Sequence, residues 1–399
     1  HCLSDALVLP IGLDCNKFIE RDCQPSIGEH TKVVKALMRN VGCSADHLGT
    51  QSGLQQLVIG LSRLELDRDV GVFLRVFADR GLAIPLDKFV AIESDWKDQG
   101  VAEAVSNIGS VGGKTIAIPF SLSTPVLVFN NQLVAAAGGD PADLPTTWDG
   151  IFELAKKIST LEPGVSGFYM EYFANGAFGF QTLLFSQNGR MMNANETDIA
   201  FDSPQGLAAM TMMKQASDAG MIDLSTKDGR QAFVGGKIGI YEMTSSTLAG
   251  FEKQIGSQFS LTMTSIPLAP GGKMPTGGNG MVMLTKDPAR QEAAWKYMKF
   301  AASPKAQAIM AAMTGYVPIN KAALSDPELQ KLYQDSPNYT VPFRQLKDLT
   351  AWYAFPGENS TKVAAMINSK MQLVLKGKLT PQEALGEAAK EARNLILNK

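Results

Sequence analysis

Three aromatic residues crowd one short segment, LTAWYAFPGENS, near the C-terminal end of the chain. Trp352, Tyr353 and Phe355 lie within four positions, and the Pro-Gly pair after them excludes a continuous helix. Aromatic side chains bury large areas wherever they lie, so a place in the core is one explanation. A flat wall against a bound ligand is the other.

Histidine and cysteine chemistry could come only from the start of the chain. All histidines and cysteines lie within the first 47 residues: His1, His30, His47, Cys2, Cys15, Cys23 and Cys43. Their spacing contains no C-x-x-C pattern, so we expect no zinc site, although disulfides between an even number of cysteines stay open. A Ser-His-Asp or Cys-His arrangement would depend on this segment. The compositional break also leaves open a separate origin for residues 1–68.

Other catalytic patterns are missing from the sequence. The glycine-rich segment TGGNG at residues 276–280 is too short for a dinucleotide-binding motif and lacks the lysine of a P-loop. Paired carboxylates for glycoside hydrolysis have no fixed spacing in a sequence, because only their distance in space matters. We therefore expect no catalytic activity, no cofactor and no metal. A carbohydrate-active enzyme that uses two carboxylates is the alternative from another class.

The composition is that of a globular protein with room for two domains. The chain has 399 residues, of which 45% are hydrophobic and 19% charged. A formal net charge of -2 gives no field that would attract nucleic acid. No apolar stretch reaches the roughly 18 residues that a membrane helix needs. The chain opens at His1, so a removed signal peptide stays open, whereas a lipid anchor on Cys2 is not favoured because no lipobox is visible.

Strands and helices alternate along the segment that must position the candidate residues. Apolar runs at 115–118 and 124–129 predict two strands separated by Ser121-Leu122-Ser123, and KIGIYEM and GMVMLT predict two more. Helix starts are predicted at Thr147, Ser203-Pro204, Asp287-Pro288, Ser303-Pro304 and Thr380-Pro381, the last with Glu383 placed for a capping box. Trp148 and Trp295, on such helices, are expected in the core. This alternation predicts an α/β fold in which helices cover the sheets.

Four segments carry a resemblance to a known family. They are LPTTWDGIFELAKKIS at 144–159, the strand KIGIYEM followed by Thr244-Ser245-Ser246, TGYVPIN at 314–320, and VLKGKLTPQEALGEAAKEARNLI near the C-terminus. In this order they resemble the extracellular solute-binding proteins of ABC importers, in the branch that contains the maltose-binding and glycerol-3-phosphate-binding proteins. The resemblance covers residues 69–399, and residues 1–68 have the right length for the first strand-helix-strand of that fold.

The resemblance implies two α/β lobes joined by a hinge that the chain crosses three times, the periplasmic-binding-protein fold. Mapped by motif, the crossings fall near Ser121–Thr124, Asn279–Leu284 and Pro318–Ala322. The N-terminal lobe then comprises residues 1–122 and 284–318, and the C-terminal lobe residues 123–283 and 319–399. Closure of this hinge around a ligand would present a liganded shape to the importer.

Aromatic candidates for ligand contact come from three segments. Trp352 and Tyr353 match the aromatic pair at the cleft of maltose-binding-type proteins. There a flat ring covers the C–H face of a pyranose and leaves the edge hydroxyls free for hydrogen bonds. Tyr172 matches a stacking tyrosine of the family, and Tyr316, within TGYVPIN, resembles a cleft tyrosine of the glycerol-phosphate branch. Packing in the core is the alternative for each, and the expected role of Phe355.

Small polar residues and glycines are the other candidates. Ser245 and Ser246 end a predicted strand, so a hydroxyl or backbone N–H there could meet a ligand oxygen, and a simple helix cap is the alternative. Gly277 and Gly278 would let a ligand approach the backbone, or would form a turn. Ser123, at the first predicted crossing, is a further candidate.

We expect a neutral mono- or oligosaccharide as the ligand. A phosphate needs a cation or an array of donors, and residues 349–357 contain no Arg or Lys where the glycerol-phosphate branch would place its arginine. Arg344 and Lys347 lie upstream and could fold back, so glycerol 3-phosphate or a glycerophosphodiester is the alternative. The resemblance also implies a monomer in the periplasm or outside the cell. Its partners would be the permease subunits of an ABC importer, with no nucleic acid.

Overall fold

The computed structural model describes residues 70–101, 108–173 and 175–396. The chain divides into two compact units, His1–Thr50 and Gln51–Lys399, and every described residue belongs to the second. All histidines and cysteines, with the expectations on zinc, disulfides and a lipid anchor, lie outside the described residues. Within the described ranges, every helix is too short or too polar to cross a membrane.

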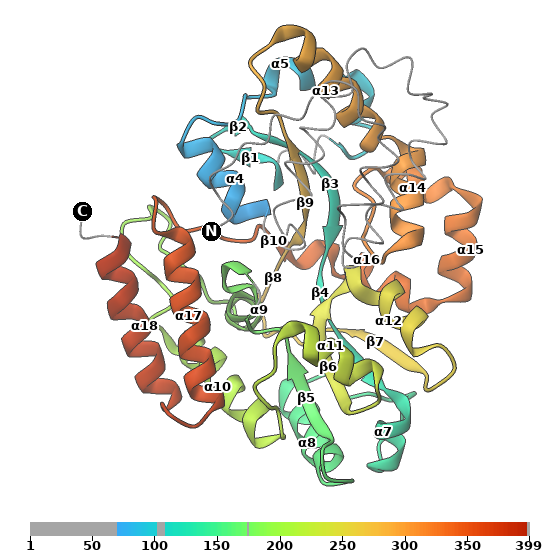
Figure 1. The fold of residues 1–399 in the computed structure, drawn as a ribbon, viewed down its shortest axis with the longest axis vertical. Helices are drawn as coiled ribbons and strands as arrows, with labels where there is room; N and C mark the ends of the chain where they lie inside the picture. The colour runs from blue at the N-terminus through green and yellow to red at the C-terminus, as the bar shows by residue number, and fades with distance from the viewer. Residues whose placement is uncertain (1–69, 102–107, 174, 397–399) are drawn as a thin grey trace, which may run out of the picture. The chain divides into compact units, whose positions relative to one another are not determined.

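A four-stranded sheet forms the centre of the largest hydrophobic cluster (Figure 1). Its order is β5-β6-β4-β7, with β4 Pro125–Asn130, β5 Ser166–Met170, β6 Ile238–Thr244 and β7 Leu261–Ser265. β5 and β6 are parallel, whereas β4 pairs antiparallel with both β6 and β7. Every residue of β4, β5 and β6 is buried, as in sheets that helices cover on both faces.

Helices pack on this sheet and on one another through apolar faces. α8, Trp148–Ser159, buries Ile151, Ala155 and Ile158, the spacing of an amphipathic helix. The other helices of this cluster are α7 Asn131–Ala136, α9 Phe178–Ser186, α10 Pro204–Asp218, α11 Thr226–Val234, α12 Leu248–Ile255, α17 Ser360–Leu375 and α18 Pro381–Ile396. α17 and α18 lie side by side and pack against α10 (Figure 1).

The predicted helix starts are confirmed. The side chains of Thr147, Ser203, Asp287 and Ser303 each accept a hydrogen bond from a backbone N–H of the first turn. At the last helix, Thr380 N–H donates to Glu383 Oε2 at 2.9 Å and Glu383 N–H donates to Thr380 Oγ1 at 3.2 Å, which is a capping box. Each such cap contributes about 1 kcal/mol to stability.

A second strand pair corrects one expectation. β3, Ala117–Ser123, pairs antiparallel with β9, Gly277–Val282. The expectation that Ser121-Leu122-Ser123 separates two strands is wrong, because these residues lie within β3, opposite Asn279, Gly278 and Gly277. Glycine on the facing strand lets the backbones come together around this polar stretch. Only Thr124 separates β3 from β4.

A separate hydrophobic cluster lies on this strand pair. It joins Leu86, Trp96 and Ile118 to Met281 and Met283 of the β9 segment, and it includes Trp295 of α13, which is 5% exposed. Trp148 is buried in the larger cluster, so both tryptophans are core residues as expected. The division of the chain into lobes at residues 122, 283 and 318 stays a prediction.

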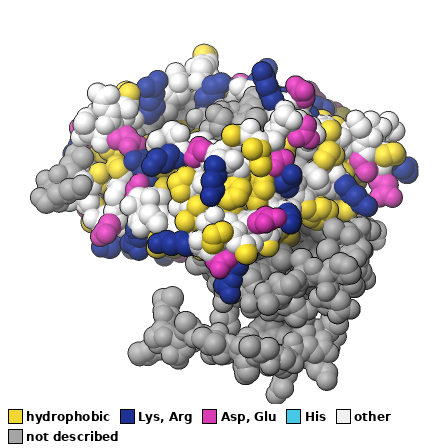
Figure 2. All heavy atoms as spheres, turned by 90° about the horizontal axis from the view of Figure 1, so that it is seen from above, with side chains coloured by type: hydrophobic (Ala, Val, Ile, Leu, Met, Phe, Trp, Pro, Cys, Tyr) yellow, Lys and Arg dark blue, Asp and Glu magenta, His cyan; other side chains and the backbone are white. Residues whose placement is uncertain are grey.

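Further helices and strands complete the described part of the chain. They are α4 Val70–Asp79, α5 Asp87–Val90, β1 Ser110–Val111, β2 Lys114–Thr115, β8 Met274–Pro275, α13 Pro288–Ala301, α14 Pro304–Met313, α15 Pro327–Asp335, α16 Val341–Gln345 and β10 Leu349–Thr350. Among them, α16 and β8 add Val341 and Met274 to the larger cluster. On the face shown in Figure 2, Lys and Arg side chains are interspersed with Asp and Glu, so this face offers no field of a single sign.

Candidate functional site

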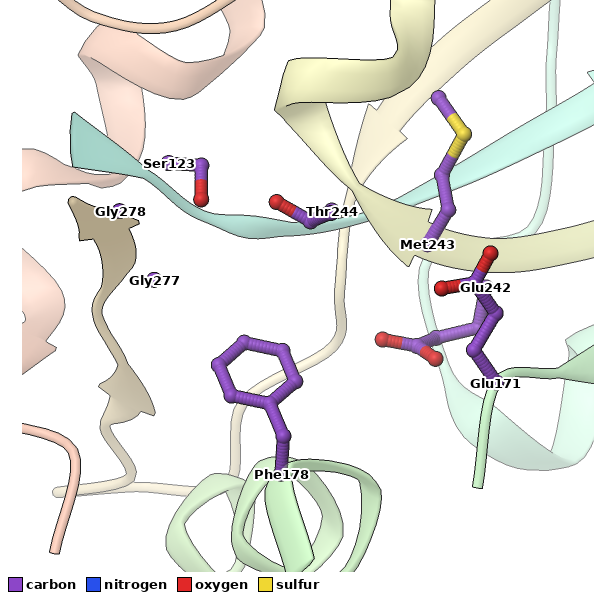
Figure 3. Close-up of a pocket in the computed structure, with 8 residues that line it drawn as sticks. All are labelled: Ser123, Glu171, Phe178, Glu242, Met243, Thr244, Gly277 and Gly278. Carbon is purple, nitrogen blue, oxygen red and sulfur yellow. The ribbon is translucent and has the colours of Figure 1, made fainter. Parts of the chain in front are cut away.

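A pocket lies where the four-stranded sheet, the β3–β9 pair and α9 approach one another (Figure 3). The pocket is narrow: its empty space is about 340 Å³ only when the open solvent at its mouth is counted. Its lining residues are Ser123, Glu171, Phe178, Glu242, Met243, Thr244, Gly277 and Gly278. β5 and β6 are parallel and both end at this pocket, which is the edge where α/β sheets commonly bind ligands.

Gly277 and Gly278 line the pocket from β9, and close strand pairing requires both of them. A Cβ on Gly277 would lie 2.5 Å from Ser123 Oγ, and one on Gly278 would lie 2.1 Å from the backbone oxygen of Ser121. Gly278 also has φ 136°, a conformation that residues with side chains rarely adopt. The two glycines therefore lie in a strand and not in a turn. Ser123, facing Gly277, brings a hydroxyl group to the same wall (Figure 3).

Among the described residues, Phe178 supplies the one aromatic ring of the lining. Two successive left-handed residues, Gly176 with φ 65° and Ala177 with φ 56°, turn the chain into α9 and place Phe178 at its first position. Trp352 packs perpendicular to the Phe178 ring, with centroids 6.0 Å apart. Its Nε1 donates a hydrogen bond to Gly176 O at 3.2 Å. Trp352 thus lies behind Phe178 and is 7% exposed.

The three predicted tyrosines lie outside the pocket lining and make contacts elsewhere. Tyr353 donates from its hydroxyl to Glu196 Oε1 at 2.8 Å. Tyr172 is buried, and its hydroxyl donates to Asp223; burial, with this bond, raises the pKa of Tyr172 above its ordinary value. The Tyr316 hydroxyl accepts a hydrogen bond from the side-chain amide of Asn279 at 3.0 Å.

The two predicted serines hold the junction after β6. Ser245 is fully buried, and its N–H donates to Thr124 O at 2.9 Å while its Oγ accepts from Thr124 N–H at 3.3 Å. Ser246 Oγ lies 3.3 Å from Thr244 Oγ1. Of the nine predicted residues, the structure brings Ser123, Gly277 and Gly278 to the pocket lining. Ligand contact by any of the nine stays a prediction.

Two buried glutamates of the lining were not predicted from the sequence. Glu171 directly follows β5, and Glu242 lies in β6 opposite Met170, so neighbouring strands bring the two carboxyl groups to one side of the pocket (Figure 3). The signal was a lone acidic residue in each apolar strand, GFYMEYF and KIGIYEM. A charged residue inside a buried strand is rare unless it is paired or functional.

The two glutamates differ in their partners. Arg230 Nε donates to Glu171 Oε1 at 2.8 Å, and the Tyr241 hydroxyl donates to the same oxygen at 3.0 Å. Glu242 is 2% exposed, and its Oε1 has no hydrogen-bond partner among the described residues. Burial raises the pKa of the Glu242 carboxyl to about 8.

The lining can therefore offer hydrogen-bond acceptors, hydroxyl groups and one ring face to a small molecule. Among the described residues no Lys or Arg lines the pocket, and Arg230 is engaged by Glu171. Arg344, a candidate cation for a phosphate, bonds to Thr340 Oγ1 on its own helical turn.

Sequence and structure comparisons extend over most of the chain. The sn-glycerol-3-phosphate-binding periplasmic protein UgpB of Escherichia coli K12 is 23% identical over 370 residues, which cover 90% of this chain and 82% of UgpB. A solute-binding protein from Thermotoga lettingae TMO, bound to α-D-tagatose, superposes with a TM-score of 0.73 at 18% identity, over 95% of this chain and 97% of that one. UgpB from Mycobacterium tuberculosis, in complex with glycerophosphocholine, also gives 0.73, at 17% identity over 94% and 96%.

These likenesses confirm the expected α/β, two-lobed fold of periplasmic binding proteins. The sequence pattern of one family, described as bacterial extracellular solute-binding protein, matches residues 69–340. The chain belongs to the bacterial extracellular solute-binding proteins.

Proposed function

We propose that this protein binds a neutral sugar or polyol in the pocket between β3, β6, α9 and β9. It delivers this ligand from the periplasm to the permease subunits of an ABC importer. The family and the likeness to an ABC transporter protein bound to a sugar support this transport role. No step of it requires bond breaking by the protein.

The observation that supports a neutral ligand is the acidic lining of the pocket. A phosphate group would lie against Glu171 and Glu242 without a free cation from the described part of the lining. Phosphate recognition normally uses arginine or lysine, or an array of N–H donors. Hydroxyl groups, in contrast, pair well with carboxylate oxygens and with the Ser123 hydroxyl, and the Phe178 ring suits a C–H face.

Glycerophosphate is the second candidate, because two of the similar proteins carry names that refer to glycerol 3-phosphate or glycerophosphocholine. At 23% and 17% identity the likeness leaves the ligand open. Two carboxyl groups in one pocket are also what a carbohydrate-active enzyme would use, so the experiments below include a test for turnover.

A thermal-shift panel tests the proposal directly. We expect maltose, D-tagatose or ribitol to raise the melting temperature, since a ligand at 100 times its Kd stabilises a folded protein by about 2.7 kcal/mol. Titration calorimetry then gives the Kd of each hit. A response to sn-glycerol 3-phosphate or glycerophosphocholine alone would contradict the neutral-ligand proposal. Incubation with maltotriose, followed by product analysis, would expose turnover.

A further inference from the structure

One buried carboxyl oxygen lacks the partner that such a group normally has. Glu242 Oε1 is shielded from solvent and makes no hydrogen bond within the described ranges of the chain. Nearly all buried polar atoms in native proteins are hydrogen-bonded, because an unpaired one keeps its full cost of desolvation. The side chain belongs to the lining of the pocket, and Figure 3 shows its carboxyl group there.

The neighbouring Glu171 shows what a structural glutamate looks like in this sheet. Its carboxylate is held by Arg230 and by the Tyr241 hydroxyl, so it forms a buried pair with its own cation. Arg230 donates to both carboxylate oxygens of Glu171, from Nε to Oε1 at 2.8 Å and from Nη2 to Oε2 at 3.5 Å. The sheet therefore satisfies one carboxyl group and leaves the other facing the pocket.

We propose that Glu242 is a ligand-binding residue whose carboxyl group hydrogen-bonds a hydroxyl group of a neutral sugar or polyol. This inference rests on the proposed function of the pocket and deepens it, because it names the residue that selects for hydroxyl groups. Ser123 and Thr244 line the pocket as well, so the same ligand can meet further hydroxyl groups.

The chemistry of the buried carboxyl fits a hydroxyl group. With its pKa raised to about 8, Glu242 is largely the neutral acid near neutral pH, and the acid offers one O–H donor and one acceptor. A sugar hydroxyl offers the same two functions and can satisfy both. The titratable groups near it are Glu171, which directly follows β5, Tyr169 of β5 and Tyr241 of β6, while Arg230 of α11 is engaged by Glu171.

Two substitutions separate a ligand contact from a packing role. Glu242→Leu keeps most of the volume and removes both hydrogen-bonding functions, whereas Glu242→Gln keeps a donor and an acceptor. We expect Glu242→Leu to weaken maltose or ribitol binding by about tenfold or more, because the ligand hydroxyl loses its partner at a buried position. We expect Glu242→Gln to stay within about threefold of the wild type, as a rescue by the conservative variant.

Thr182→Val is the matched control. Thr182 is fully buried in α9, its Oγ1 also lacks a partner among the described residues, and it does not belong to the pocket lining. Removing its hydroxyl should leave the Kd unchanged. Glu242→Leu should fold, because it removes an unpaired polar group from a buried position, and circular dichroism with thermal melting checks this.

Calorimetric titrations of the full chain with maltose, D-tagatose and ribitol give distinguishable outcomes. A loss of affinity in Glu242→Leu, with affinity kept in Glu242→Gln and Thr182→Val, supports the inference. The probe with the lowest Kd shows whether the pocket prefers a cyclic sugar or an open-chain polyol. Unchanged affinity in a folded Glu242→Leu overturns the inference and leaves the proposed function standing. Binding of sn-glycerol 3-phosphate alone, or of no neutral probe, overturns both.

Discussion

Trp352 is predicted from the sequence to contact the ligand, and this contact stays a prediction. Three aromatic residues at a helix-breaking segment predict a ring in contact with a ligand, and in the structure Trp352 packs against Phe178, a lining residue of the pocket. Among the described residues, the ring that lines the pocket is Phe178, and Trp352 packs at right angles behind it. Trp352 is thereby suited to hold Phe178 in place.

Two matched substitutions distinguish the ring on the wall from the ring behind it. Phe178→Leu removes the flat face and should weaken maltose binding by about 1 kcal/mol, roughly fivefold. Trp352→Phe keeps an aromatic ring against Phe178 and should change the affinity less. Titration calorimetry on both variants measures this order. The reverse order would place the ligand against Trp352, as the resemblance to maltose-binding-type proteins implies.

The Glu242 carboxyl should also make stability depend on pH. Its pKa is about 8 in the folded protein against an ordinary value of 4.5, so between these values the folded state holds a proton that the unfolded state has lost. This contribution is complete below the lower value and is lost as the pH rises through the higher one. The slope from one group reaches about 1.4 kcal/mol per pH unit.

Melting curves of the wild type and Glu242→Gln between about pH 5 and about pH 8 measure this contribution. Other titrating groups cancel in the comparison. The amide has no proton to lose, so the melting temperature of the variant should rise relative to that of the wild type as the pH increases. A constant difference across this range would mean that Glu242 is ionised and paired in the folded protein.

At the scale of elements, the β3–β9 pair depends on Gly278. This residue has φ 136°, and a Cβ would lie 2.1 Å from the backbone oxygen of Ser121, which cannot move without opening the strand pair. We expect Gly278→Ala to destabilise the protein by roughly 3 kcal/mol or more, the strain and the clash together. Urea unfolding measures the change.

Gly236→Ala is the matched control for this prediction. Gly236 also has a positive φ, 72°, but no atom lies within 4 Å of a Cβ built on it. Its substitution should cost only the backbone term, about 1–2 kcal/mol. Equal losses at the two glycines would show that the close approach of β3 and β9 contributes nothing beyond backbone strain.

Elements with a strong local signal were predictable from the sequence. The caps at Ser203, Asp287 and Ser303 and the box at Thr380 depend on residues within one turn, and each forms as predicted. The predicted strand ended too early, at residue 118, whereas β3 continues to Ser123. Its polar end pairs with glycines of β9, which follow more than 150 residues later in the sequence. Only the pairing partner reveals that strand.

The pocket was harder to predict, because its members depend on distant partners. Tyr172 follows a strand as a stacking ring would, yet its hydroxyl bonds to Asp223 in another segment. Glu171 and Glu242 look alike in the sequence, and only the position of Arg230 makes one of them paired. Ser123 lies at the end of β3 and Gly277 and Gly278 at the start of β9, so the pairing of these strands brings the three residues together in the lining.

At the scale of the whole molecule, one ion pair links the two predicted lobes. Arg75, on α4, donates from both terminal nitrogens to the Glu196 carboxylate, each at 2.7 Å. α4 packs through Leu74 against Ile116, and both residues lie in the predicted N-terminal lobe. Glu196 and Tyr353, which also bond to each other, lie in segments of the predicted C-terminal lobe. The pair therefore joins segments that a hinge motion would separate.

Breaking this pair should weaken ligand binding without touching the pocket. Neither Arg75 nor Glu196 is a lining residue, so an effect of Arg75→Gln on affinity would have to act through the equilibrium between open and closed forms. Both side chains are partly exposed, at 26% and 33%, so solvent screens the pair and we expect no more than about 1 kcal/mol, roughly fivefold in Kd.

Glu196→Gln should give a similar loss, and the double variant should lose no more than either single one, because both remove the same interaction. Raising the salt concentration should weaken binding by the wild type and leave Arg75→Gln unaffected. Small-angle scattering completes the test: saturating maltose should lower the radius of gyration of the wild type, and Arg75→Gln should need more maltose to reach the same value. Additive losses in the double variant, or an affinity indifferent to Arg75→Gln, would show that the pair does not couple the lobes to the ligand.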